Sequence, residues 1–215
     1  MKRARKNIKA ATKAGIFATA IFLGTIATNA APAPTAEKAL VYDAEAVIQF
    51  KGTSTLHDFT GAVKALPFVL RLNPGSNGQP ATWSAQAEAW AGEMDTHHQS
   101  RDRNMHKMFN TNQYPRLSGA VTNALVPGRE KGAADLALRL RSVEQVIPVT
   151  IQDWKADADE ISFQATWLVS LKQYGLKPPS VLGIVRVGDQ VSVVAEVRAR
   201  RQTNSPAFPA KPMKP

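Results

Sequence analysis

Apolar and polar residues alternate strictly in two segments near the end of the chain. In residues 161–171 every second residue is apolar, and the residues between them are mostly polar. Residues 191–200 repeat this alternation. A period of two is typical of a half-buried antiparallel strand. Between the two segments, Gly175 and the pair Pro178-Pro179 exclude a helix and favour extended or turn backbone. The pattern therefore predicts two long strands joined by a stiff connection.

The preceding part of the chain carries six more segments with a period of two and one segment with a helical pattern. The six predicted strands cover residues 39–51, 57–72, 81–94, 116–126, 133–143 and 147–156. The helical segment is 95–110, where Thr96 is a candidate cap. Many strands with regular turns and a single helix indicate a closed barrel rather than alternating strands and helices. The predicted fold class is all-β, an extended antiparallel β-barrel of about eight strands with one helix inserted near residues 95–110.

Residues 1–30 are typical of a secretory signal peptide. Six lysines and arginines precede an apolar run at residues 14–27, which is shorter than the ~20 residues of a membrane-spanning helix. Small residues follow, so we expect cleavage near Ala30 and a periplasmic or secreted mature protein, with an uncleaved anchor as the alternative. We also expect a flexible spacer at residues 31–38 and a disordered, proline-rich tail at residues 202–215.

This leader changes the interpretation of the charge. The formal net charge of the whole chain is +10, but the leader holds six of the 27 basic residues and none of the 17 acidic ones, which leaves +4. The high isoelectric point therefore does not indicate a nucleic-acid partner. The chain contains no cysteine, which excludes disulfides, thiolate metal sites and cysteine hydrolases.

The third predicted strand has unusually small residues on one face. Alanine occupies five of the six alternate positions in residues 81–91, and the sixth is Trp83. A barrel of about eight strands is either filled by its side chains or holds one ligand, and small inward residues favour an open lumen. The alternative is that the alanines face bulky partners such as Phe163 and Trp167 across the barrel.

Three sequence motifs occur along the chain in the same order as in one known protein family. They are GTSTLHDFTG at residues 52–61, RDRNMHKMFNTNQYPRL at residues 101–117 and the two strands with their connection at residues 161–194. Together they resemble the YceI-like family of lipid- and polyisoprenoid-binding proteins over residues 39–201, the expected barrel domain. The resemblance implies a lipocalin-like barrel that holds an isoprenoid-type chain, polyisoprenoid or quinone-like, in an apolar tunnel. It also implies that two copies of the chain pair as a homodimer.

The expected lining of the lumen combines small residues, aromatic rings and the apolar stripe of the helix. The candidate ligand-binding residues are Ala44, Ala46, Ile48, Phe50, Phe59, Trp83, Ala85, Ala87, Ala89, Met105, Met108, Phe109, Phe163, Ala165, Trp167, Val193 and Ala195. Because methionine adapts to irregular contacts, the helix stripe suits either a lid over the mouth or ordinary docking on the barrel end. A bilayer stabilises a lipid tail nearly as well as the lumen does, so we expect exchange through transient membrane contact.

The histidines are the main candidates for other chemistry. His98, Asp102 and His106 follow one another at intervals of four residues on the predicted helix, and His97 adjoins them. A metal site needs convergent ligands, whereas each such interval rotates the side chain by about 40° around the helix. A solvated helix face is therefore the preferred interpretation, and a periplasmic domain with a metal or haem redox partner is the alternative. We expect His57 to hydrogen-bond a neighbouring loop.

No catalytic arrangement is recognisable in the sequence. The segment GTSTL at residues 52–56 resembles an esterase elbow but lacks its second glycine and the strand–turn–helix context. No phosphate-binding glycine loop is present. We expect a protein without enzymatic activity, cofactor or metal, and a ligand-free structural or stress-related barrel is a further alternative.

Six arginines outside the leader allow two interpretations. They either gather at one rim, where they would meet a lipid pyrophosphate, or decorate a solvated surface, which is the preferred interpretation. They are Arg139, Arg141, Arg186, Arg198, Arg200 and Arg201.

Overall fold

The protein is described by a computed structural model that covers residues 39–75, 80–128, 131–178, 180–181 and 185–202. The expected signal peptide, the spacer up to residue 38 and the tail from residue 203 lie outside the described residues. Residues 76–79, in the connection between the second and third predicted strands, also lie outside them.

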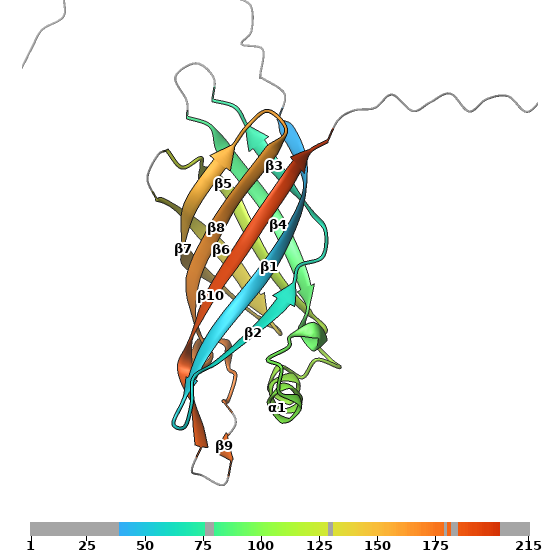
Figure 1. Ribbon diagram of the computed structural model, residues 1–215, viewed down its shortest axis with the longest axis vertical. Coiled ribbons are helices and arrows are strands. Elements are labelled where there is room, and N and C mark those ends of the chain that lie inside the picture. Colours follow the sequence, from blue (N-terminus) through green and yellow to red (C-terminus); the bar gives the residue numbers. More distant parts are fainter. Residues whose placement is uncertain (1–38, 76–79, 129–130, 179, 182–184, 203–215) are drawn as a thin grey trace, which may run out of the picture. The chain divides into compact units, whose positions relative to one another are not determined.

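The described chain forms a closed antiparallel barrel with one α-helix (Figure 1). The elements are β1 (Leu40–Ser54), β2 (Phe59–Lys64), β3 (Phe68–Asn73), β4 (Thr82–Trp90), η1 (Ala91–Glu93), α1 (Gln99–Phe109), β5 (Arg116–Leu125), β6 (Gly132–Leu140), β7 (Val143–Ala156), β8 (Glu160–Ser170), η2 (Lys172–Tyr174), β9 (Ser180–Val181) and β10 (Val185–Arg201). The sheet order is β2-β1-β3-β4-β5-β6-β7-β8-β10-β9, and pairing of β1 with β10 closes it. The predicted all-β barrel with a single helix is confirmed.

The closing pair of strands explains why the ends of the sheet meet. β1 and β10 stay in register from Tyr42 opposite Arg201 to Gly52 opposite Val191. On the inward side, small or branched residues face each other, as at Ala46 and Val197. The long alternating segments at the two ends of the barrel sequence therefore become neighbours with one shared apolar face.

The segment predicted as a single strand over residues 57–72 is in fact two strands. β3 pairs with the first part of β1, and β2 pairs with its second part. Pro67 lies between them and cannot donate a ladder hydrogen bond, which explains the break. β3 also pairs with β4, whereas in the β2 part of this segment isolated bridges join Ala62 to Asp95 and Ala65 to Ala89 of β4.

Three other predicted boundaries are wrong. β4 ends at Trp90 because the short η1 helix follows. The helix begins at Gln99 instead of residue 95, and the residue before it, His98, makes no side-chain capping hydrogen bond. β6 and β7 meet in a tight turn with Arg141 at a φ of 57°, so β7 already begins at Val143.

Aromatic side chains close one end of the barrel, where β1 begins. The ring centroids of Trp83 and Phe163 are 5.3 Å apart, and those of Phe163 and Trp154 are 4.9 Å apart. Tyr42 and Leu70 pack at the same end with at most 1% of their surface exposed. This end of the barrel is a filled core, whereas α1 lies at the opposite end (Figure 1).

A second small core supports the wall at the helix end. Tyr174 of η2 and Leu176 are buried, and the Tyr174 hydroxyl donates a hydrogen bond to the Leu138 carbonyl at 3.3 Å. Burial raises the pKa of the Tyr174 phenol to about 12. The connection after β8 is therefore fixed against β6.

Candidate functional site

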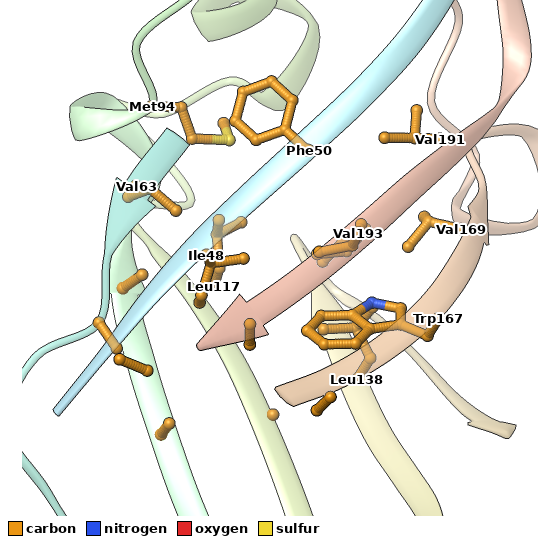
Figure 2. Close-up of a pocket in the computed structure, with 18 of the residues that line it drawn as sticks. Ile48, Phe50, Val63, Met94, Leu117, Leu138, Trp167, Val169, Val191 and Val193 are labelled. Carbon is orange, nitrogen blue, oxygen red and sulfur yellow. The ribbon is translucent and has the colours of Figure 1, made fainter. Parts of the chain in front are cut away.

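The barrel encloses a cavity of about 540 Å³. Its wall is formed by inward side chains of most strands and by one side of α1. Figure 2 shows Ile48, Val193 and Trp167 pointing into the same space from β1, β10 and β8. The wall is almost entirely hydrocarbon, so the cavity suits an apolar ligand.

The cavity exists because small residues occupy inward positions on several strands. Ala85 and Ala87 of β4 line it, and Ala165 of β8 and Ala195 of β10, which are paired with each other, line it from another side. A closed core would place larger side chains at these positions. The alternative of alanines packed against bulky partners holds only at the aromatic end, where Trp83 and Phe163 form the floor.

All the predicted site residues except Ala44 line this cavity. Ala44 is 5% exposed and belongs to the packed core at the aromatic end, where it pairs with Phe68 and Ala199. Its placement in the lumen is therefore corrected, because aromatic rings fill that end of the barrel. Contact of the other residues with a ligand stays a prediction.

Several residues that line the cavity were not among the candidates predicted from the sequence. They include Val63, Met94, Leu117, Leu138, Val169 and Val191, all labelled in Figure 2. Alternation in β5, β6 and β10 could have found Leu117, Leu138 and Val191.

The glycines of the GTSTLHDFTG motif make room for two phenylalanine rings in the cavity wall. Phe50 pairs with Gly61, and Gly52 pairs with Phe59, across β1 and β2. A Cβ atom at either glycine would overlap the ring of its partner. Phenylalanine rings lying over cross-strand glycines stabilise this part of the sheet, so the motif builds the wall near the mouth.

The cavity opens at the end that α1 flanks, and most of its polar lining residues gather there. Ser54 is the last residue of β1, His57 lies in the loop between β1 and β2, and α1 with its preceding residue contributes the others. Those are His98, Ser100, Arg101 and Asn104. Leu56 of the same loop is 60% exposed at this mouth. The arrangement places hydrocarbon in the interior and hydrogen-bonding groups at the opening.

A polar cluster fixes the start of α1. The hydroxyl of Thr96 donates to Oδ1 of Asp102 at 2.6 Å, and the Thr96 backbone N–H donates to the same oxygen at 3.0 Å. Partial desolvation raises the pKa of Asp102, but the hydrogen bonds from Thr96 and from the His98 backbone, with the nearby His106, lower it more, so the net pKa is lowered. Thr96 therefore bonds back to the helix, although it does not occupy the capping position.

Backbone hydrogen bonds tie the segment before α1 to the barrel. Ala62 and Asp95 exchange two such bonds, at 2.8 and 3.0 Å. Nε2 of His106 lies 3.0 Å from the carbonyl oxygen of Met94. Met105 and Phe109 are buried, so α1 is anchored through these apolar residues and through the segment at its start.

The histidines do not converge. His106 contacts the Met94 carbonyl, whereas Nδ1 of His98 lies 3.1 Å from the Ser100 hydroxyl. Within the described part of the chain, no group of three or more His, Cys, Asp or Glu residues could hold a metal ion. In the loop that contains His57, the hydrogen bonds run between the Ser54 hydroxyl and the His57 backbone.

The six arginines do not gather at one rim. Arg139, Arg141 and Arg186 belong to the helix end of the barrel, and Arg198, Arg200 and Arg201 belong to the aromatic end. Arg139 pairs with Glu144 at 2.8 Å on the surface. In the portion covered by the structure, no helix is long and apolar enough to cross a membrane.

Two solved structures share this fold. A polyisoprenoid-binding domain from Saccharophagus degradans aligns with a TM-score of 0.53 and 18% identity, and covers 77% of this chain and 100% of its own. Burkholderia cenocepacia BcnA aligns with a TM-score of 0.57 and 12% identity, and covers 71% of this chain and 95% of its own. No curated protein matches the sequence.

The family comparison covers most of the barrel. A family model described as the YceI-like domain matches residues 36–199, which include every strand except the last two residues of β10. This range agrees with the motifs at residues 52–61, 101–117 and 161–194. The chain therefore belongs to the YceI-like domain family.

Proposed function

We propose that the protein is an exported lipid-binding protein that holds an isoprenoid-type chain, polyisoprenoid or quinone-like, in its barrel lumen. The observation that carries this proposal is the apolar cavity of about 540 Å³, closed by aromatic rings at one end and open at the other. Its volume is within the ~300–1,000 Å³ of small-molecule sites. The polyisoprenoid-binding domain from Saccharophagus degradans has the same fold, which supports this class of ligand.

The energetics suit a carrier. Burial of hydrocarbon stabilises a bound chain by ~0.8 kcal/mol per methylene relative to water. A bilayer offers nearly the same stabilisation, so modest additional affinity is enough for exchange with a membrane. Leu56 is exposed at the mouth, and we propose that this end makes the transient membrane contact.

A binding role is favoured over catalysis by the groups that face the cavity. Among the described lining residues, Glu88 is the only carboxylic acid and Arg101 the only lysine or arginine. Glu88 forms an ion pair with Arg116 at 3.4 Å, so it is already engaged. The metal or haem alternative is less favoured, because His98 and His106 contact different neighbours.

Mass spectrometry of the lipid fraction that copurifies with the mature protein tests this proposal, together with metal analysis of the same sample. We expect an isoprenoid-type lipid at close to one molecule per barrel and no stoichiometric metal. Stoichiometric metal or haem without lipid would favour the redox alternative. Neither lipid nor metal would favour a ligand-free structural barrel.

Export rests on the basic and apolar pattern of residues 1–30. N-terminal sequencing of the exported protein should begin within a few residues of Ala31.

The homodimer expected from the family resemblance stays a prediction. The exposed side chains of Val146 and Leu168 lie on the adjacent strands β7 and β8, and sedimentation of Leu168→Ser against the wild-type protein would test their role.

A further inference from the structure

Arg101 is distinctive among the residues around the cavity. It is the only lysine or arginine among the described residues that line it. It lies on the first turn of α1, at the open end, and its side chain is half-buried. A cation at the mouth of a hydrocarbon cavity is placed to meet the polar head of a ligand whose tail fills the interior.

The guanidinium is held in a fixed orientation by neutral partners. Nε donates to the Thr96 hydroxyl at 2.9 Å, and Nη2 donates to the Thr96 carbonyl at 3.3 Å. Thr96 is only 5% exposed, so this anchor is itself rigidly packed. The guanidinium carbon lies 5.1 Å from the centroid of the Phe59 ring. These contacts orient the planar group before any ligand binds.

Among the described residues, no carboxylate forms an ion pair with the guanidinium of Arg101. The nearest polar link to an acid passes through the Thr96 hydroxyl to Asp102. The other acids near the mouth have partners of their own, since Asp58 pairs with Lys51 at 3.1 Å and Asp95 lies 3.3 Å from His97. Of the five N–H donors of a guanidinium, both donors on Nη1 are uncommitted in the described residues.

Further polar side chains surround this position. His57 and His98, Ser100 and Asn104 line the same opening. A phosphate or carboxylate offers several acceptor oxygens, and a guanidinium binds such groups through charge-assisted, paired hydrogen bonds. A head without charge would leave the two Nη1 donors with weaker acceptors.

We propose that Arg101 is the headgroup-binding residue of the cavity and that it selects amphiphiles whose head carries an oxyanion, a phosphate or a carboxylate. This inference rests on the proposed function, because it requires that the lumen holds the apolar tail. It adds the chemical class of the head, which the hydrocarbon wall does not specify.

Competitive displacement of the fluorescent probe N-phenyl-1-naphthylamine from the full mature protein tests the proposal. The competitors are farnesyl phosphate, farnesoic acid and farnesol, which share one tail and differ in the head. The variants are Arg101→Gln and, as a matched control, Arg103→Gln. Arg103 is exposed on the same helix and does not line the cavity.

We expect the wild-type protein to bind the two anionic ligands about tenfold or more tightly than farnesol, because hydrogen bonds to charged groups are the stronger ones. Arg101→Gln should reduce this preference to about twofold or less and leave farnesol binding nearly unchanged. Arg103→Gln should retain the preference. Arg101→Lys should retain part of it, since it keeps the charge and loses the paired donors.

Three outcomes would overturn the proposal. One is equal binding of all three ligands by the wild-type protein, which leaves the proposed lipid-binding function intact. Another is equal weakening of all three by Arg101→Gln, which would assign Arg101 to the packing of α1 alone. The third is displacement of the probe by none of them, in which case the proposed function fails as well.

Discussion

At the scale of single residues, side-chain volume at inward positions decides where the barrel is filled and where it is open. Trp83 and Phe163 fill the aromatic end, whereas Ala85 and Ala87 leave space two and four residues along the same strand as Trp83. Ala199 belongs to the filled part, with none of its surface exposed. Two alanines in one barrel therefore have opposite tolerance for added volume.

This difference predicts opposite effects for two matched substitutions. Ala87→Trp should remove copurifying lipid and destabilise the fold by less than about 1 kcal/mol, because the ring enters open space. Ala199→Trp should destabilise it by ~1–3 kcal/mol or more, because the site is close-packed. Thermal unfolding and lipid extraction of both variants measure these effects. An Ala87→Trp protein that unfolds as early as Ala199→Trp would contradict an open lumen.

Asp102 gives a prediction about pH. Its pKa is lowered in the folded protein from the ordinary value of 3.8, with hydrogen bonds from Thr96 outweighing desolvation. Its contribution to stability is therefore present above pH 3.8 and is lost as the pH falls through the lower, folded pKa. Asp102→Asn should remove this contribution, about 1 kcal/mol at neutral pH. Denaturant unfolding at pH 7 and at a pH below the lowered, folded pKa of Asp102 should show that the two proteins differ in stability at neutral pH and converge in acid.

Local backbone geometry explains which residues could not be placed from the sequence. Strict alternation along β7 directs Asp153 inward after Val149 and Ile151. In the structure Asp153 has a φ of 55° and lies in a bulge, so the next residue, Trp154, packs against Trp83 instead. A bulge shifts the alternation by one residue, and the hydrophobic pattern alone does not locate it.

At the scale of elements, α1 depends on few contacts compared with the strands. Of its eleven residues only Met105 and Phe109 are buried, and the other anchors are the polar cluster at Thr96 and the His106 contact. β8, in contrast, is hydrogen-bonded on both sides, to β7 and β10. The existence of the helix could be predicted from its apolar stripe, but its start could not, because it depends on Thr96 bonding back to Asp102.

Hydrogen exchange should therefore be faster in residues 95–110 than in β8. Farnesyl phosphate should slow exchange in α1 more than in β8, because α1 lines the mouth of the cavity. Mass-resolved exchange of the wild-type protein, with and without this ligand, measures both effects, and Ala87→Trp is the control that lacks room for a tail. Equal protection of the two elements, unaffected by the ligand, would show that α1 is an ordinary docked helix and not a lid.

At the scale of the whole molecule, the closed barrel was predictable because most of the long strands keep a period of two over most of their length. The break at Pro67 between β2 and β3 was not predicted, although it shapes the helix end of the barrel. In this region β2 does not pair with β4 as a continuous ladder, and the contacts are isolated bridges. Asp95, which belongs to no strand, exchanges the backbone hydrogen bonds with Ala62. This incomplete pairing could not be predicted from the hydrophobic pattern, because it depends on the three-dimensional register.

A barrel that encloses unfilled apolar volume should gain stability from its ligand, which leads to a prediction about lipid removal. A ligand present at ~100 times its dissociation constant stabilises the folded state by ~2.7 kcal/mol. For a domain of this size, ~1 kcal/mol shifts the melting temperature by ~2–4 °C. Delipidation should therefore lower the Tm by about 5–10 °C, and added farnesyl phosphate should restore it. Calorimetry of both samples measures the shift.

Ala87→Trp, whose indole occupies the lumen, should melt at one temperature before and after the same treatment. A wild-type protein whose Tm is equally insensitive would mean that the lumen takes up no tail, because any ligand that binds only the folded barrel must raise its Tm.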